Sequence, residues 1–467
     1  MKIFNLQTKS ITSSALVLGI ASAFSAFSGL LRDRLLAGRF GVGDELDIYY
    51  AAFRIPDFIS MILIMGSISA AIVPIFSGYL TRNKDEAWKF LSNLFNLIIF
   101  ILVLVSIVLI IFTPQLVSLI TPGFSEEKKA MVSLITRIMF LSPIILGISN
   151  IISSVLQVFR RFLIASLSPI IYNFGIIAGI LFLAPRFGVA GLAMGVVFGA
   201  LLHLLIQVPV LFKIGFKFSR IFNFSDPGFK KVLKLTLPRS LGLAASQVNL
   251  FVIIAIASTL ASGSIAIFNL AESLSRPFFI LGGISFSTAA FPQLALSFSR
   301  EKRERFQEIY SKTFSKIILL IIPLSLILFF FRDFLVGIIL RAGKFGLVDS
   351  RLTAASLGLF AIGLFAKSLV LLIVKAFYAL QDSKTPAKAS ILAMVANVSL
   401  CFLFLRLLSF ENSFKELLTK SLSLSGSGDI RILGLPLALS LASIIQFLFL
   451  YFFFKKKMSN FNLDAKY

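Results

Sequence analysis

Cysteine, tryptophan and histidine are almost absent from this chain, since each occurs once, as Cys401, Trp88 and His203. A single cysteine excludes an internal disulfide. One histidine, in an apolar stretch, is expected to pack or to bond a neighbour rather than to relay protons. The sequence has no phosphate-binding loop of the Gly-x-x-x-x-Gly-Lys-Ser/Thr type and no nucleophile–base constellation. We therefore expect no enzyme, no cofactor, no metal site and no pump driven by its own ATPase.

Charged residues are also scarce, at 14%, against 58% hydrophobic residues and a mean hydropathy of +0.96. Apolar stretches of about 20 residues recur along the chain, and each is long enough to cross ~30 Å of hydrocarbon as a helix. Lipid offers no partner to backbone polar groups, so spanning segments are helices or closed barrels. The alternating strands of a barrel are missing. The sequence therefore predicts an all-α polytopic membrane protein.

The apolar stretches divide into twelve predicted spans, six in each half of the chain. The predicted spans are 10–31, 47–80, 90–113, 131–158, 163–184, 188–212, 230–258, 262–298, 313–340, 352–379, 385–408 and 432–454. We expect the first span to be a retained helix, because no convincing cleavage site follows it.

An internal echo connects the two halves. Ser67-Ile-Ser-Ala-Ala-Ile-Val-Pro74 reappears as Ser285-Phe-Ser-Thr-Ala-Ala-Phe-Pro292, and a charged connector follows each copy. Six spans per half is an even number, so both halves insert in the same orientation and the repeat is parallel. We expect an N-terminal lobe at 1–212, a cytoplasmic linker at 213–229 and a C-terminal lobe at 230–467. Repeated halves are common in carriers, with the substrate site between them.

Acidic residues are few, 21 against 45 lysines and arginines, which gives a net charge of +24. The cations stand in connectors between spans, so the positive-inside rule explains them better than nucleic-acid binding does. Connectors after even-numbered spans are the basic ones. We expect both termini in the cytoplasm, the 410–431 stretch outside as a mobile loop, and contact of the basic connectors with anionic phospholipids.

Charges inside spans are the best candidates for a functional site, because they are costly in hydrocarbon unless they face a cavity or a partner. The second span holds Arg54 and Pro56, and the eighth holds Glu272, Arg276 and Pro277. Guanidinium groups suit the oxygens of phosphates and carboxylates. The prolines allow the helices to bend. We expect a polar cavity between the halves, in which the arginines bind an anionic substrate and the prolines serve gating.

Simpler explanations stand beside this one. Arg54 could be neutralised by Asp57, three residues on, and Glu272 by Arg276, four residues on. Arg32 closes the first span and Asp47 opens the second, where a solvated helix end is the usual explanation of charge.

Several motifs together resemble the MurJ/MviN lipid II flippases of the multidrug/oligosaccharidyl-lipid/polysaccharide exporter superfamily. The resemblance rests on Leu31-Arg-Asp33, Phe40-Gly-Val-Gly43, Asp47, Ala52-Phe-Arg-Ile-Pro56, Thr121-Pro-Gly-Phe124 and Phe377-Tyr-Ala-Leu-Gln-Asp-Ser-Lys-Thr-Pro386. It implies a carrier that moves a lipid-linked peptidoglycan precursor from the inner to the outer leaflet of the bacterial cytoplasmic membrane. It also implies two six-helix lobes around a cationic cavity, in which Arg32 and Asp47 match charged positions and Arg54 occupies a position that is often lysine.

Three departures keep two alternatives open. Ser60 and Ser273 stand where the family has arginine, and we count no span after 454, where many members carry two more. The seventh span has no acidic residue for the sodium site of some members. The alternatives are an exporter of another lipid-linked oligosaccharide or small molecule, and a membrane scaffold without transport. We expect a monomer whose partners are a lipid-linked anionic glycan precursor and phospholipids, without nucleic acid, and a coupling ion or the membrane potential as candidate energy source.

Overall fold

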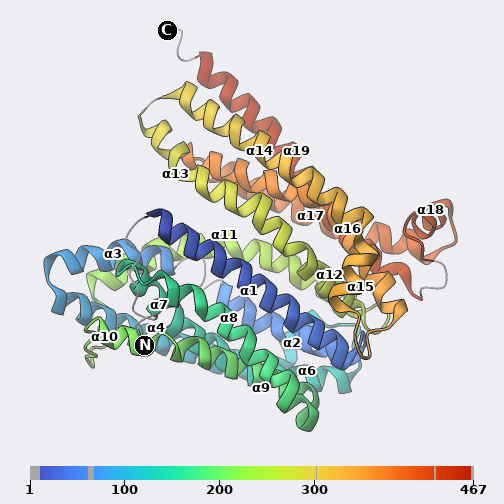
Figure 1. Ribbon diagram of the computed structural model, residues 1–467, viewed down its shortest axis with the longest axis horizontal. Coiled ribbons are helices and arrows are strands. Elements are labelled where there is room, and N and C mark those ends of the chain that lie inside the picture. The colour runs from blue at the N-terminus through green and yellow to red at the C-terminus, as the bar shows by residue number, and fades with distance from the viewer. Residues whose placement is uncertain (1–10, 62–67, 301, 425–427, 464–467) are drawn as a thin grey trace. The chain divides into compact units, whose positions relative to one another are not determined.

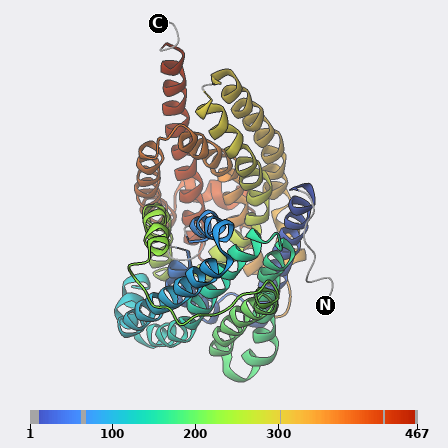
Figure 2. The same cartoon turned by 90° about the vertical axis from the view of Figure 1, so that its left-hand side faces the viewer.

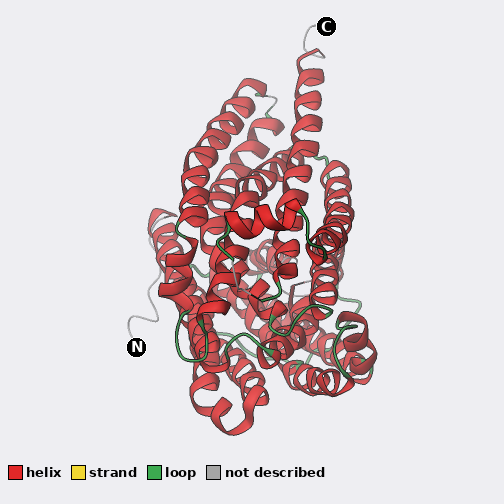
Figure 3. Ribbon diagram, turned by 90° about the vertical axis from the view of Figure 1, so that its right-hand side faces the viewer, coloured by secondary structure: helices red, strands yellow, loops and turns green. Residues whose placement is uncertain are grey.

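The computed structural model describes residues 11–61, 68–300, 302–424 and 428–463. Throughout these ranges the chain forms helices and loops without a strand (Figures 1 and 3). It divides into two compact units, the first formed by residues 1–40 and 44–247 and the second by residues 41–43 and 248–467. The two units meet within one long helix, α11, so the predicted boundary at 213–229 remains a prediction.

Unit 1 contains the helices up to the first part of α11. They are α1 (Ile11–Phe40), α2 (Asp44–Ile59), α3 (Ile68–Arg82), α4 (Lys84–Ile111), α5 (Thr113–Ile120), α6 (Glu126–Met139), α7 (Leu141–Val158), α8 (Phe162–Ala178), the π-helix η3 (Gly179–Leu183), α9 (Ala184–Leu205), α10 (Val208–Lys213) and α11 (Pro227–Ser258).

Unit 2 contains the end of α11 and the remaining helices. They are α12 (Ser264–Phe279), the π-helix η4 (Ile280–Ile284), α13 (Ser285–Ser299), α14 (Arg303–Phe330), α15 (Arg332–Leu340), α16 (Leu347–Ala379), α17 (Lys384–Ser409), α18 (Ser413–Ser421), the 3₁₀-helix η5 (Ile430–Leu433) and α19 (Gly434–Leu463).

The helix lengths repeat between the units, which confirms the parallel internal repeat. Helices α2 and α12 each have 16 residues, and α4 and α14 each have 28. A short helix follows in both units, α5 or α15, and then a long apolar segment of 33 residues, 126–158 or 347–379. Of the sequence echo, Ser67 lies outside the described residues, whereas Pro74 and Pro292 lie inside α3 and α13.

Eight helical segments of the described chain are long and apolar enough to cross a membrane. One of them, residues 162–213, joins two predicted spans, 163–184 and 188–212, across a kink at Gly188, where φ is +56°. The eight segments therefore account for nine predicted spans. The other three, 10–31, 47–80 and 230–258, correspond to α1, α2 with α3, and α11. The chain is an all-α polytopic membrane protein with two six-span lobes.

Glycines hold α8 and α9 together at backbone distance. Gly175 of α8 and Gly179, the first residue of η3, face Gly199 and Gly195 of α9, and a Cβ atom at Gly195 would lie 2.7 Å from the Gly179 Cα. Lipid tails are as apolar as the helices, so close van der Waals packing of small residues drives association inside a bilayer. This contact fixes how α8 is rotated about its axis.

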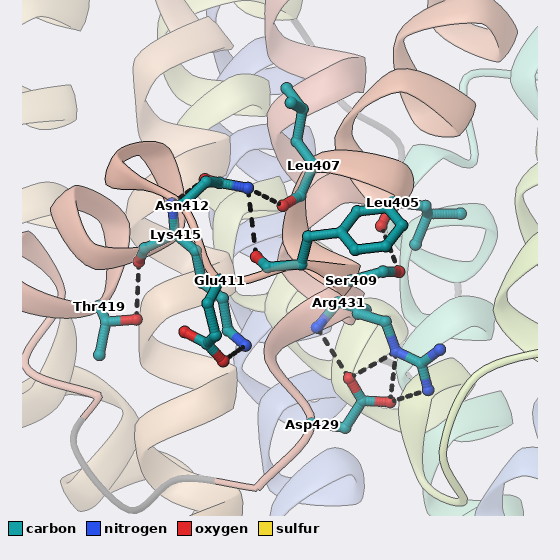
Figure 4. Close-up of polar contacts among 10 residues, drawn as sticks. Leu405, Leu407, Ser409, Glu411, Asn412, Lys415, Thr419, Asp429 and Arg431 are labelled. Carbon is teal, nitrogen blue, oxygen red and sulfur yellow. Dashed lines mark hydrogen bonds and ion pairs between the residues drawn. The ribbon is translucent and has the colours of Figure 1, made fainter.

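The 410–431 stretch was predicted to be a mobile loop, and this prediction is wrong for residues 413–421, which form α18. Asn412 caps α18 by accepting a hydrogen bond from the Lys415 N–H at 2.9 Å, and its own amide donates to the Leu407 carbonyl at 2.6 Å (Figure 4). At the other end of the 410–431 stretch, Asp429 and Arg431 form an ion pair at 2.6 Å. Asparagine is a strong N-cap, so a helix can start in this polar stretch.

A polar corner holds the turn between α16 and α17, within the motif 377–386. Lys457 of α19 donates to Asp382 Oδ2 at 2.7 Å, and the Thr385 hydroxyl donates to the same oxygen at 2.9 Å. Partial burial would raise the pKa of Asp382, but the hydrogen bonds from Lys457 and Thr385 outweigh it and lower the pKa to about 2. The carboxylate therefore stabilises this corner above its ordinary pKa of 3.8, and the stabilisation is lost as the pH falls through about 2.

We expect Gly195→Leu to destabilise the protein by about 1–3 kcal/mol or more, because the new side chain must push two backbones apart. The measurement is the midpoint of thermal unfolding in detergent. Gly78→Ala is the matched control, since a Cβ atom at that helical glycine meets nothing within 4 Å. Equal midpoints for both variants and the wild type would contradict the role given to the α8–α9 contact.

Candidate functional site

Arg32 is held in a fixed orientation inside unit 1. Its Nε and Nη2 donate to Asp33 Oδ1 at 2.9 and 2.7 Å, and its Nη1 donates to Asn173 Oδ1 at 3.1 Å. The Asp33 side chain is 2% exposed and that of Arg32 is 25% exposed. Helix α1 continues to Phe40, so these charges do not stand at a solvated helix end. Arg32 and Asp33 therefore lie within the helix and not at its end.

Asn173 ties this arginine to the rest of α1. While its Oδ1 accepts from Arg32, its Nδ2 donates to the Ser28 hydroxyl at 3.0 Å and to the Ser25 carbonyl at 3.3 Å. The residue is buried on α8. A buried amide with both ends satisfied has one preferred rotamer, so it orients the guanidinium that it contacts.

Helix α2 carries the other predicted residues of unit 1. Asp47 is in its first turn and buried, and Arg54 stands seven residues later, two turns along the same face, half-buried. A salt bridge of 2.6 Å from Lys128 of α6 to Asp44 fixes the start of the helix. Thr136 of α6 also donates to the Ala52 carbonyl at 3.2 Å. Arg32, Asp47 and Arg54 therefore lie on two helices of one unit.

Glu272 of unit 2 has a partner that the sequence did not indicate. Its Oε1 lies 3.9 Å from Nζ of Lys367 on α16, and the same ammonium lies 5.0 Å from the centre of the Phe279 ring. Arg276 is exposed, and within the described residues it takes part in no ion pair. The proposed self-neutralising pair of Glu272 with Arg276 is thus replaced by a pair with Lys367, which leaves the Arg276 guanidinium available to a ligand.

A second lysine follows Lys367 on α16. Lys375, two turns on, donates to the Thr288 hydroxyl of α13 at 2.6 Å. Together with Arg276, these lysines give the membrane-spanning helices α12 and α16 three cations, against the one carboxylate Glu272, which lies beside Lys367. Such a set favours an anionic ligand over a cationic one.

The two predicted gating prolines share a backbone feature. Pro56 lies inside α2, and residues 60 and 61 adopt a π-helical turn just after it. Pro277 lies inside α12, and η4 (Ile280–Ile284) follows directly. Proline removes one hydrogen bond of the helix, and π-turns are frequent at functional sites. The repeat thus places a weakened helix segment at the same point of each unit; that this segment serves gating stays a prediction.

Asn173, Lys367 and Lys375 were missed as site residues. Each is a polar or charged residue in an apolar span, which is the signal that singled out Arg54 and Arg276. The contact between Arg32 and Asn173 could not be predicted from the sequence, because the two residues are 141 positions apart. Ser60, which stands at a family arginine position, is buried and donates to the Pro56 carbonyl at 3.1 Å.

Two repeated units of membrane-spanning helices, with charged groups held inside the spans, define a membrane transporter of the two-lobe type. The sequence profile described as "Lipid II flippase MurJ" matches residues 36–465. The chain belongs to the MurJ lipid II flippase family.

Curated relatives agree along most of their length. A probable lipid II flippase MurJ of Buchnera aphidicola subsp. Schizaphis graminum is 32% identical over 390 residues, which cover 82% of this chain and 76% of the relative. The lipid II flippase MurJ of Burkholderia cenocepacia is 28% identical over 393 residues, covering 82% and 76%.

Solved structures give the same fold. A lipid II flippase MurJ in an inward closed conformation matches with a TM-score of 0.77 at 25% identity, covering 96% of this chain and 90% of that one. An inward-facing multidrug resistance transporter of the MATE family matches with a TM-score of 0.71 at 14% identity, covering 94% and 95%. The second likeness concerns the fold alone.

We expect Asn173→Ala to lower transport about 10- to 100-fold, since the loss of a hydrogen bond to a charged group is worth roughly 1.5–3 kcal/mol. The measurement is the rate of lipid flipping in vesicles. Asn150→Ala is the matched control, because the Asn150 amide bonds only the Leu146 carbonyl of its own helix. Similar rates for both variants would contradict the orienting role of Asn173.

Proposed function

We propose that this protein flips lipid II, the lipid-linked peptidoglycan precursor, from the inner to the outer leaflet of the bacterial cytoplasmic membrane. The observation that carries the proposal is family membership over residues 36–465, combined with arginines held inside membrane spans. Relatives named lipid II flippases align with most of this chain.

The cargo explains why costly charges persist in the spans. A lipid pyrophosphate bears negative charge on both phosphates and cannot enter hydrocarbon without compensation. Arg32 and Arg54 of unit 1 and Arg276 of unit 2 supply the compensating charge. A guanidinium presents two parallel N–H donors to phosphate oxygens, which gives direction as well as attraction.

Asp47 and Glu272 have their role when no cargo is bound. In the absence of cargo a carboxylate keeps nearby cations from repelling one another, as Glu272 does beside Lys367. Pyrophosphate then replaces the carboxylate as partner. The number of charges in the low-dielectric region stays balanced through the cycle, which limits the free energy of each intermediate.

Transport proceeds by alternating access, with bending at Pro56 and Pro277. Both termini, the 213–229 stretch and the 299–312 connector lie in the cytoplasm, and α18 lies outside. The protein acts as a monomer, and a coupling ion or the membrane potential supplies the energy. The proposed orientation follows from loop charge, and the proposed bending follows from the prolines and the π-turns after them. An exporter of another cargo and a transport-free scaffold gain no support from the relatives.

We expect Arg54→Ala and Arg276→Ala each to reduce flipping at least tenfold and to abolish complementation of a cell depleted of its lipid II flippase. Each change removes a charge-assisted hydrogen bond to the pyrophosphate. Lysine at either position should rescue only partly, because it lacks the bidentate fork. Membrane insertion is checked by the amount of folded protein recovered.

Arg305→Ala is the matched control for these variants, because Arg305 is 58% exposed in a salt bridge at the start of α14. It should complement fully. The double variant Arg276→Leu with Glu272→Leu tests self-neutralisation. Full activity of that variant would refute the role of Arg276 in cargo binding.

The topology is tested with single cysteines at Ser311 and Ser413, both exposed, after Cys401→Ala. We expect an impermeant thiol reagent on intact spheroplasts to label position 413 and to label position 311 only after lysis. Labelling in the reverse order would overturn the orientation.

A further inference from the structure

The segment between α10 and α11, residues 214–226, is extended rather than helical, and we call it the connector. Figure 2 shows it as a green thread without coils against the blue and teal helices of unit 1. It lies along α4, to which side chains and backbone attach it. A free linker would make no such regular contacts.

Polar side chains of α4 take the place of a neighbouring strand for this backbone. Asn93 accepts from the Asn223 N–H at 2.7 Å and donates to the carbonyl of the same residue at 2.9 Å. Ser92 accepts from the Ser219 N–H at 3.0 Å. Asn96 donates to the Ile221 carbonyl at 2.8 Å. Several backbone groups that water would otherwise solvate are satisfied by the protein.

The position of these contacts on α4 explains why the connector backbone needs hydrogen-bond partners from the protein. Residues 90–111 contain no ionisable side chain, and 22 helical residues span about 33 Å, the thickness of the hydrocarbon. Ser92, Asn93 and Asn96 fall in the first two turns of that segment. Non-helical backbone at such a depth persists only where the protein provides its hydrogen-bond partners.

Aromatic contacts extend the contact between the connector and α4 further along the helix. The rings of Phe222 and Phe224 lie 5.4 and 6.3 Å from the ring of Phe100. All three side chains remain exposed, at 54%, 47% and 47%. Phe100 begins an exposed apolar stripe of α4 that continues through Val103, Leu104, Ile107, Val108 and Ile111. The exposed face of the connector is thus continuous with the lipid-facing side of a membrane span.

Cations surround this apolar face. Lys217 and Arg220 of the connector are exposed, and so are Lys213 before it and Lys230 and Lys231 after it, whereas Asp226 is the one acid in residues 212–234. Exposed phenylalanine beside exposed lysine and arginine is the pattern of segments that lie in the membrane interface. Basic residues there attract anionic headgroups.

We propose that the connector is a membrane-interface anchor, with Phe222 and Phe224 below the headgroups and with Lys217 and Arg220 contacting anionic phospholipid. The surface is independent of the cargo site, and it does not depend on which lipid-linked molecule is transported. Its occupant is a bilayer containing phosphatidylglycerol. A soluble protein partner at the same surface is the competing outcome of the test below.

The full-length protein with Phe222→Trp is reconstituted in vesicles of phosphatidylcholine and phosphatidylglycerol whose acyl chains carry bromine. The wild type is the matched control, because its single tryptophan, Trp88, is 2% exposed and packed between aromatic rings. We expect bromine to quench the added tryptophan and to leave Trp88 emission almost unchanged. Equal quenching in variant and wild type would overturn the anchor and leave a soluble partner as the occupant of this face.

The preference for anionic lipid is tested by placing bromine on one lipid at a time in equimolar mixtures. We expect about fivefold more quenching of Phe222→Trp when phosphatidylglycerol carries the bromine, because one nearby cation attracts anionic lipid by about 1 kcal/mol. Lys217→Gln with Arg220→Gln in the same background should make the two mixtures equal. Lys312→Gln, far along the chain and 69% exposed, should not. Equal quenching before these changes would overturn the anionic contact.

Discussion

A polar group placed in hydrocarbon must find its partner within the protein, and this constraint shapes every notable feature of the chain. Arg32 is satisfied by Asp33 and Asn173, and Glu272 by Lys367. The connector obeys the same rule with backbone groups, which bond Ser92, Asn93 and Asn96. The polar groups discussed above form two classes. Some, such as Asn93, are hydrogen-bonded within the protein, and others, such as Arg276, are exposed and accessible to a ligand.

The two units share a backbone plan but differ in their charged residues. Both units keep a proline followed by a π-turn in α2 or α12, together with equal helix lengths. Their charges differ. Unit 1 combines Arg32 with the buried Asp33, whereas unit 2 pairs Glu272 with Lys367 and leaves Arg276 exposed.

Most of the fold could be predicted from the sequence, because hydropathy alone identifies segments that must cross a bilayer. The repeat was visible in the echo that ends at Pro74 and Pro292. The pairing of side chains was harder to predict from the sequence. The sequence suggested Arg276 for Glu272 because the two are one turn apart, yet the nearer cation, Lys367, is 95 positions away and arrives through packing of α16 on α12. Helix α18 was missed because serine and glycine near its end resemble a flexible loop, although Asn412 supplies a helix start.

The glycine contact between α8 and α9 has a mechanical consequence. Two residues before Gly175, the same helix carries Asn173, so the group that orients Arg32 is built on a backbone that cannot turn without α9. A tilt of α9 would therefore also move Asn173, and with it the hydrogen bond that orients the Arg32 guanidinium. A small apolar compound that separated these helices from the lipid side would therefore displace Asn173 and loosen the orientation of Arg32 without contacting Arg32 itself.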